Sequence, residues 1–213
     1  MKVIIFFVIC MNMALAAEDQ KGMWLGTFAN KKLTENYSFW IETQLRYNLD
    51  EGNAAQVLYR TGVLQKLNER QGLGYLYAFI QSGLNKEHRF TLQHTQSYGN
   101  LSNYKFSHRV RVETRHLEET TESFEAAGRL RYLLRAEQRD DKNYALVVWD
   151  EVFINLNETS WNGHDTQDRN RFFIGVKQEF FASNRLELGY LNQFIPRESG
   201  DISEHIATVY LFF

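Results

Sequence analysis

Short segments in which charged and apolar side chains alternate run along the whole chain, and they constrain its fold more than any other feature. The clearest is HRVRVETRH, residues 108–116. Side chains of a β-strand point alternately to its two faces. The charged and apolar sets therefore lie on opposite faces, with Arg109, Arg111, Glu113 and Arg115 on one and Val110, Val112 and Thr114 on the other. In a soluble β-protein the charged face meets water, whereas in a membrane β-barrel it lines the interior.

Eleven such segments are separated by polar or glycine-containing turns, which is the pattern of consecutive β-strands. The chain is rich in aromatic residues, with 16 Phe and 11 Tyr, and has a single proline, as extended pleated structure requires. We therefore predict an all-β fold, an antiparallel transmembrane β-barrel of about 10 to 12 strands. The predicted strands are residues 23–29, 37–47, 56–67, 72–81, 88–98, 105–117, 124–138, 144–155, 169–182, 185–194 and 202–213.

The first residues have the composition of a secretory signal peptide. A lysine stands near the start, an apolar run extends from Val3 to Cys10, and small residues follow at the spacing of a cleavage site. This run is too short for a spanning helix, which needs about 20 apolar residues. We predict a signal peptide at residues 1–16 and a single outer-membrane β-barrel domain at residues 17–213. Cys10 is the only cysteine, so the mature chain has no disulfide.

The connections between strands alternate in length toward the C-terminus. Residues 196–201 and 156–168 form long connections, whereas 182–184 and 139–142 form tight ones. Outer-membrane barrels have short periplasmic turns and longer external loops. The pattern weakens at residues 99–104, which belong on the periplasmic side without looking tight.

The chain ends in an aromatic residue, in the sequence TVYLFF. Phe213 resembles the C-terminal signal by which outer-membrane barrels are selected for assembly, whereas a soluble domain usually ends in frayed, polar residues. We therefore expect export to the cell outer membrane, with outer-membrane lipid and the barrel assembly machinery as partners.

Charge and motifs argue against several classes of function. The formal net charge is −2, and basic and acidic residues are mixed along the same segments, so no nucleic-acid-binding patch is expected. The sequence has no HExxH motif, no paired histidines at ligand spacing and no acidic calcium loop, so we expect neither a metal nor a cofactor. Asp165 and Asp168 fall in a predicted long loop, which we interpret as a solvated turn.

Together these features resemble the outer-membrane β-barrel family catalogued as domain of unknown function 2490. The resemblance runs over nearly the whole mature chain and implies a Gram-negative outer-membrane barrel. The family has no assigned activity, so it supplies no catalytic residue. The matching features are Trp24, the strand with Glu42 and Arg46, HRVRVETRH, Glu151–Phe153, Asp168–Arg171 followed by Gly175, and Gly189–Tyr190 with Gln193.

The inward faces are predicted to form a lattice of charges across neighbouring strands. Arginine and glutamate suit lateral pairing inside an enclosure, and a barrel of this strand number is narrow enough for side chains to fill much of it. We predict a non-enzymatic structural or narrow-pore protein with little discrimination between cations and anions, because both signs line the wall. The predicted members are Glu42, Arg46, Arg109, Arg111, Glu113, Arg115, Arg129, Arg131, Glu151, Arg171, Glu179 and Glu187.

The number of predicted strands is odd, whereas known bacterial barrels have an even number. Single-chain bacterial barrels have an even number of strands and both termini in the periplasm, whereas the sequence shows eleven segments. We therefore expect the segment that contains Trp24 to lie outside the barrel wall, and the other ten to close the barrel.

Two alternative functions stay open. A membrane-embedded hydrolase of lipid or lipopolysaccharide needs a hydroxyl nucleophile beside a histidine base. The candidates for such a site are His94, Ser97, His108, Ser203 and His205, with His94 and His108 expected to point toward lipid. The other alternative is a soluble periplasmic barrel that binds an apolar ligand in its interior.

Overall fold

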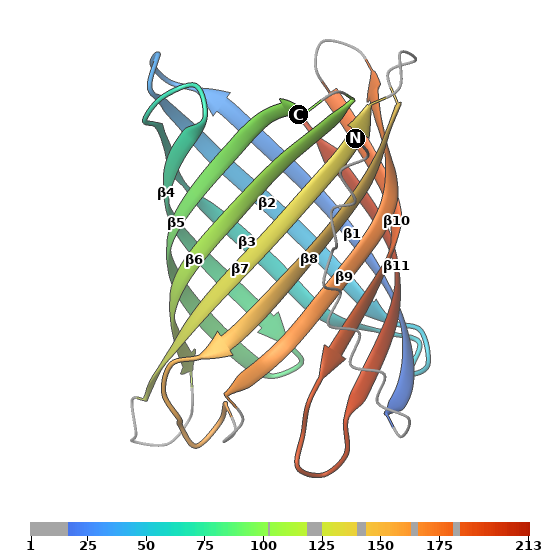
Figure 1. Cartoon of the computed structure of the whole chain (residues 1–213). Coiled ribbons are helices and arrows are strands. Elements are labelled where there is room, and N and C mark those ends of the chain that lie inside the picture. Colours follow the sequence, from blue (N-terminus) through green and yellow to red (C-terminus); the bar gives the residue numbers. More distant parts are fainter. Residues whose placement is uncertain (1–16, 102, 119–124, 140–143, 163–165, 181–183) are drawn as a thin grey trace.

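The chain forms a closed barrel of eleven β-strands in the computed structural model (Figure 1). The structure describes residues 17–101, 103–118, 125–139, 144–162, 166–180 and 184–213. The predicted signal peptide at residues 1–16 lies outside these ranges. Within them, no helix is long and apolar enough to cross a membrane. The strands are β1 Glu18–Lys32, β2 Tyr37–Asn48, β3 Asn53–Lys66, β4 Gln71–Ser82, β5 Asn85–Leu101, β6 Tyr104–Glu118, β7 Ala126–Arg139, β8 Tyr144–Asn155, β9 Gln167–Phe180, β10 Asn184–Ile195 and β11 Ile202–Phe212.

The barrel closes through a parallel pair of strands, β1 and β11, and every other neighbouring pair is antiparallel. Glu18 lies opposite Ile202 at one end of this seam, and Phe28 lies opposite Phe212 toward the other. The expectation that the Trp24 segment lies outside the wall was therefore wrong, because β1 also pairs with β2. Each strand edge in a membrane must be hydrogen-bonded. A parallel ladder satisfies that condition as an antiparallel one does, so an odd number of strands closes.

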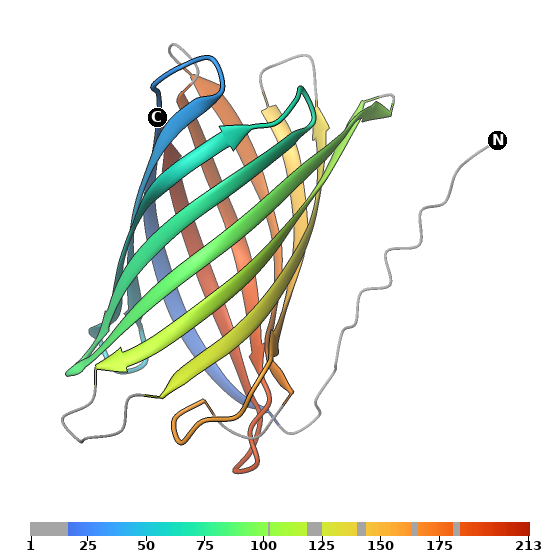
Figure 2. The ribbon, with the colours of Figure 1, turned by 90° about the vertical axis from the view of Figure 1, so that its left-hand side faces the viewer.

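The two ends of the barrel differ in the length of their connections. At the end that holds the C-terminus, the strands are joined by two to four residues throughout. The β5–β6 turn is among them, although the sequence did not look tight there. β5 reaches this turn through a bulge, at which Gly99 has a φ of 80° that glycine adopts without strain. At the opposite end, residues 119–125, 156–166 and 196–201 form the longer connections, and the strands between the two ends are strongly tilted (Figure 2).

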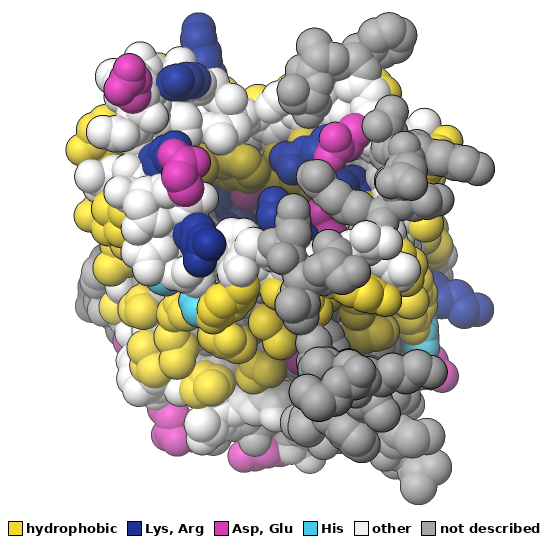
Figure 3. All heavy atoms as spheres, turned by 45° about the horizontal axis from the view of Figure 1, so that its top comes forward, with side chains coloured by type: hydrophobic (Ala, Val, Ile, Leu, Met, Phe, Trp, Pro, Cys, Tyr) yellow, Lys and Arg dark blue, Asp and Glu magenta, His cyan; other side chains and the backbone are white. Residues whose placement is uncertain are grey.

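The inner and outer faces of the wall have opposite chemistry. On β6, Glu113 points inward with 0% exposure, whereas Val112 is 45% exposed on the outer surface. Figure 3 shows hydrophobic side chains gathered on the visible part of the outer wall and charged side chains inside the rim. This arrangement is that of a transmembrane β-barrel. The outward hydrophobic residues include Phe39, Ile41, Phe90, Leu92, Val112, Ile174, Val176 and Leu188.

Part of the interior is apolar and closely packed. Phe173 is fully buried and stacks on Trp149 with ring centroids 5.0 Å apart. Two facing glycines, Gly175 and Gly189, make room for the Phe173 ring, because a Cβ atom at Gly189 would lie 2.5 Å from it. Trp24 belongs to the same cluster. The lumen is therefore lined by aromatic as well as charged side chains.

Candidate functional site

The centre of the lumen is an ion-pair network built on β6, β7 and β8. Glu113 lies directly across from Arg129 in the β6–β7 register. Its carboxylate accepts hydrogen bonds from Arg129 at 2.6 and 3.0 Å and from Arg131 at 2.8 Å. Arg131 also donates to Glu151 at 2.9 Å, and Glu151 accepts a bond of 2.9 Å from Arg109. Two glutamates thus hold three arginines together across three neighbouring strands.

An aromatic ring supports this network. Phe153 is 1% exposed on β8. The guanidinium carbons of Arg129, Arg131 and Arg171 lie 5.2, 4.3 and 4.7 Å from the centroid of its ring. Guanidinium groups are attracted to aromatic faces. Phe153 therefore helps to hold three like charges close together.

Two smaller ion-pair clusters lie on β2, β3, β5 and β6. Glu42 lies directly opposite Arg60 and accepts its hydrogen bonds at 2.7 Å. Glu87 accepts bonds of 2.6 Å from both Arg89 and Arg115. All five side chains are buried, so these pairs are shielded from water.

A further cluster lies toward the C-terminal end of the barrel. Arg135 donates to Glu187 at 2.6 Å and to Glu137 at 2.8 Å, and Lys177 donates to Glu137 at 2.6 Å. Glu179, a predicted member of the lattice, has a side chain that is 44% exposed and lies 3.5 Å from Lys177. It lies near the end of β9, where water reaches the inner face.

Several charged residues of the lumen were not among the predicted members. Glu87 was missed because β5 begins three residues earlier than the predicted segment, whereas Arg89 lies inside that segment and was not selected. Arg60 and the terminal Lys66 are the charged residues of β3, so no run of charges marked this strand, and only the register shows that Arg60 lies opposite Glu42. The others are Arg135, Glu137 and Lys177.

The interpretation of Asp168 as a solvated turn residue was wrong. Asp168 is the second residue of β9, and its carboxylate accepts hydrogen bonds from Arg129 at 2.7 Å and from Arg169 at 3.0 Å. It extends the central network toward the end of the barrel opposite the C-terminus. Asp165 lies outside the described residues.

Three lumen arginines face glutamine instead of glutamate. In each case the two residues lie directly opposite in the strand register, and the glutamine oxygen accepts a hydrogen bond from the guanidinium at 2.6 to 2.7 Å. The ion pairs found between described residues include none of these arginines. The pairs are Arg46 with Gln56, Arg111 with Gln93, and Arg171 with Gln193.

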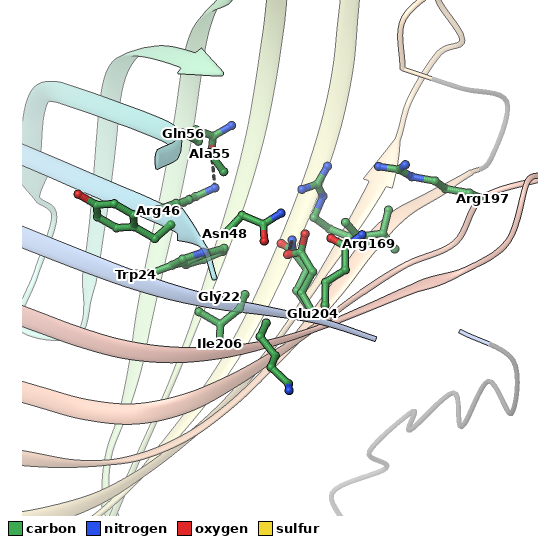
Figure 4. Close-up of a pocket in the computed structure, with 15 residues that line it drawn as sticks. Gly22, Trp24, Arg46, Asn48, Ala55, Gln56, Arg169, Arg197, Glu204 and Ile206 are labelled. Atoms are coloured by element: carbon green, nitrogen blue, oxygen red, sulfur yellow. Dashed lines mark hydrogen bonds between the residues drawn. The ribbon is translucent and has the colours of Figure 1, made fainter. Parts of the chain in front are cut away.

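Two cavities of the lumen share lining residues, and a third, of about 470 Å³, lies between Trp161, Asp168 and Arg197 toward the end opposite the C-terminus. The first of the two, of about 240 Å³, lies at the end opposite the C-terminus, where Arg46, Arg169, Arg197 and Glu204 surround it (Figure 4). The other, of about 200 Å³, lies in the middle of the lumen and is lined by eight arginines, three glutamates and several aromatic rings. Trp24 and Arg46 line both cavities. The two spaces therefore adjoin at these side chains.

The structure does not bring the candidate hydrolase residues together as an active site. His108 lies on the outer face near His94, with ring centroids 6.0 Å apart, but its Nδ1 lies 2.6 Å from the Tyr98 hydroxyl. His205 is likewise engaged, by Tyr190 at 2.6 Å and by Asp19 at 3.2 Å.

The two candidate serines are not placed as nucleophiles either. The Ser203 hydroxyl accepts a hydrogen bond of 2.9 Å from Asn192. Ser97 is an odd number of residues from His94 along β5, which places the two on opposite faces of the strand. In the described part of the chain, no three His, Cys, Asp or Glu residues are grouped to hold a metal ion.

Comparison with known proteins agrees with this architecture. The family model described as "Protein of unknown function (DUF2490)" matches residues 21–204. An uncharacterised protein of Methylorubrum extorquens is 29% identical over 189 residues, which are 82% of this chain and 79% of that protein. The NanC porin structure is similar in fold, with a TM-score of 0.55 at 7% identity over 86% of this chain and 94% of the porin chain. Because the family match spans almost the entire barrel, the chain belongs to the DUF2490 family.

Proposed function

We propose that the protein is an outer-membrane β-barrel that forms a narrow pore, most of whose cross-section is filled by the ion-paired side chains of the lumen. The observation that carries this proposal is the pair of adjoining cavities, of about 240 and 200 Å³. Trp24 and Arg46 line both cavities, and the proposed path runs from one cavity to the other past these two side chains. A path of this size admits small solutes one at a time.

The charges along this path favour anions. Among the buried side chains of the described wall, eight are cationic and six are anionic. Around the central cavity the imbalance is larger, with eight arginines and three glutamates. From this count we propose anion selectivity, whereas the presence of both signs in the sequence led us to expect little discrimination between cations and anions. A lumen with an excess of fixed cations attracts anions and repels cations.

The proposal includes a location and a route of assembly. Residues 1–16 direct export, and the outward hydrophobic residues contact outer-membrane lipid. The barrel assembly machinery recognises Phe213. The similarity in fold to a porin supports this location. The backbone of Phe213 also takes part in closure, because its N–H donates to the Phe28 carbonyl at 2.8 Å.

Cell fractionation and planar-bilayer recording test the proposal together. We expect the protein in the outer-membrane fraction, with an electrophoretic mobility that changes on heating, and small conductance steps in bilayers. A large, stable conductance would contradict the filled lumen. A folded barrel that conducts no ions would contradict the pore and support a plugged, structural role.

A further inference from the structure

We infer that the lumen contains a binding site for small organic carboxylates with an apolar body, formed by Arg46 and Arg171 beside the ring of Trp24 and by Arg111, which lines the same central cavity. This inference deepens the proposed function, because it names the class of solute that the pore recognises. Binding itself requires only the folded barrel, so it is measurable whether or not the barrel conducts.

The first argument is that glutamine fixes an arginine without neutralising it. Where glutamate lies opposite arginine, as Glu42 lies opposite Arg60, the wall itself compensates the positive charge. Opposite Arg111 and Arg171, which are 5% and 8% exposed, the equivalent positions are glutamines. Burying a cation without a counter-charge is unfavourable. An anion that enters the lumen supplies the missing charge.

The second argument is that donors in the same place are unused. The Nε–H groups of Arg60 and Arg109 are buried and have no hydrogen-bond partner among the described residues. Both side chains line the central cavity. Carboxylate oxygens accept hydrogen bonds from guanidinium groups in a well-defined planar geometry, so a bound carboxylate satisfies donors that the wall leaves open.

The third argument is the arrangement around Trp24. The guanidinium carbon of Arg46 lies 3.9 Å from the centroid of the Trp24 ring, and that of Arg171 lies 4.8 Å from it. Figure 4 shows Arg46 beside Trp24, with its hydrogen bond to Gln56 drawn as a dashed line. One aromatic ring thus orients two arginines at the junction of the two cavities.

The fourth argument concerns the rest of the ligand. The central cavity is also lined by Phe28, Trp40, Leu133, Trp149 and Tyr210. An inorganic anion would leave this apolar lining unused, whereas a carboxylate with an apolar body fills it. The volume of about 200 Å³ is somewhat larger than the roughly 150 Å³ of a protein cavity that accommodates benzene. Benzoate therefore has the size and the charge that the site requires.

The test is calorimetric titration of the full barrel in non-ionic detergent and low-chloride buffer, with benzoate and its neutral analogue benzamide as probes. We expect benzoate to bind roughly tenfold to a hundredfold more tightly than benzamide, as one or two charge-assisted hydrogen bonds provide. Equal affinity for the two probes, or no binding of benzoate, would overturn the inference.

Two variants place a carboxylate opposite an unneutralised arginine. Gln93→Glu supplies a counter-charge to Arg111, and Gln56→Glu supplies one to Arg46. Each is expected to weaken benzoate binding roughly tenfold or more while keeping the heat-modifiable mobility of a folded barrel. We do not choose Gln193→Glu as a third variant. Gln193 also donates a hydrogen bond to Glu204, and a glutamate at position 193 would repel that carboxylate.

The matched control is Gln81→Glu, which adds the same charge at an exposed position at the end of β4. Benzoate affinity is expected to stay at the wild-type value in this control. If Gln93→Glu and Gln56→Glu behave like Gln81→Glu, the arginines do not form the site. Benzoate binding without bilayer conductance would support the carboxylate site and contradict the pore. Conductance without benzoate binding would support the pore and contradict the carboxylate site.

Discussion

Replacing Glu113 by glutamine tests the central ion-pair network of the barrel. Glu113 has no exposed surface, and its carboxylate accepts three hydrogen bonds, two from Arg129 and one from Arg131. Glutamine keeps the shape but removes the charge and turns an N–H₂ group toward arginine donors. Breaking a buried ion pair by removing one partner costs about 3 to 5 kcal/mol.

The structure places the expected cost at the lower end of that range. Arg129 retains a bond of 2.7 Å to Asp168, and Arg131 retains one of 2.9 Å to Glu151. Each arginine therefore keeps one carboxylate, and we expect Glu113→Gln to lower the free energy of unfolding by about 3 kcal/mol.

The measurement is urea unfolding of the refolded barrel in lipid vesicles, followed by the fraction with folded mobility in unheated gels. Glu118→Gln is the matched control on the same strand, because Glu118 forms an exposed ion pair of 3.5 Å with Lys86. Such pairs contribute about 0 to 1 kcal/mol. Equal, small effects of the two substitutions would refute the view that Glu113 is held in an enclosed, ion-paired lumen.

Three further predictions concern the outer face, the C-terminus and a loop. Val112→Arg should destabilise the membrane-embedded barrel by about 2 to 4 kcal/mol while Val112→Leu is tolerated, and a harmless arginine in the same unfolding assay would contradict a lipid-facing Val112. Deleting Phe213 should leave export intact but lower the amount of heat-modifiable barrel in the outer membrane, and Phe213→Ala, which keeps the backbone, should do the same if the aromatic ring is the signal. Unchanged barrel levels in both would count against it. Two hydrogen bonds from Ser160 favour the charged form of Glu125 and so lower its pKa. This contact should therefore persist above the usual pKa of a glutamate and be lost as the pH falls through the lowered value. The measurement is the protection factor of the Ser160 amide, that is, its exchange rate relative to the intrinsic rate at each pH. A protection factor that does not fall with this titration would disprove the coupling.

Period-two alternation was sufficient to predict the strands and the chemistry of their faces. The segment from Tyr144 to Asn155 was predicted with both of its observed ends, and HRVRVETRH has its charges inside because lipid accepts only the apolar face. The rule of even strand numbers led to one wrong prediction, because the strand that contains Trp24 belongs to the barrel wall. It describes how known barrels are built, whereas the physical requirement is only that every strand edge be paired.

The pairing inside the lumen was beyond the reach of sequence reasoning, because partners are set by strand register. Arg109 binds Glu151, which is 42 positions away in the sequence, and alternation alone does not specify which strands approach across a curved wall. Arg111 and Arg129 look alike in the sequence. Only the register shows that Arg111 faces Gln93 whereas Arg129 faces Glu113. The first arginine therefore has no carboxylate directly opposite it, and the second forms an ion pair.

The reversal potential of the barrel in a planar bilayer under a potassium chloride gradient tests the central claim most directly, namely that the lumen carries an excess of uncompensated arginine. The wild-type protein is expected to give a potential whose sign corresponds to anion selectivity. The double variant Gln56→Glu with Gln93→Glu is expected to move that potential toward zero, because two arginines gain counter-charges. Cation selectivity in the wild type, or a potential that the double variant leaves unchanged, would contradict the account.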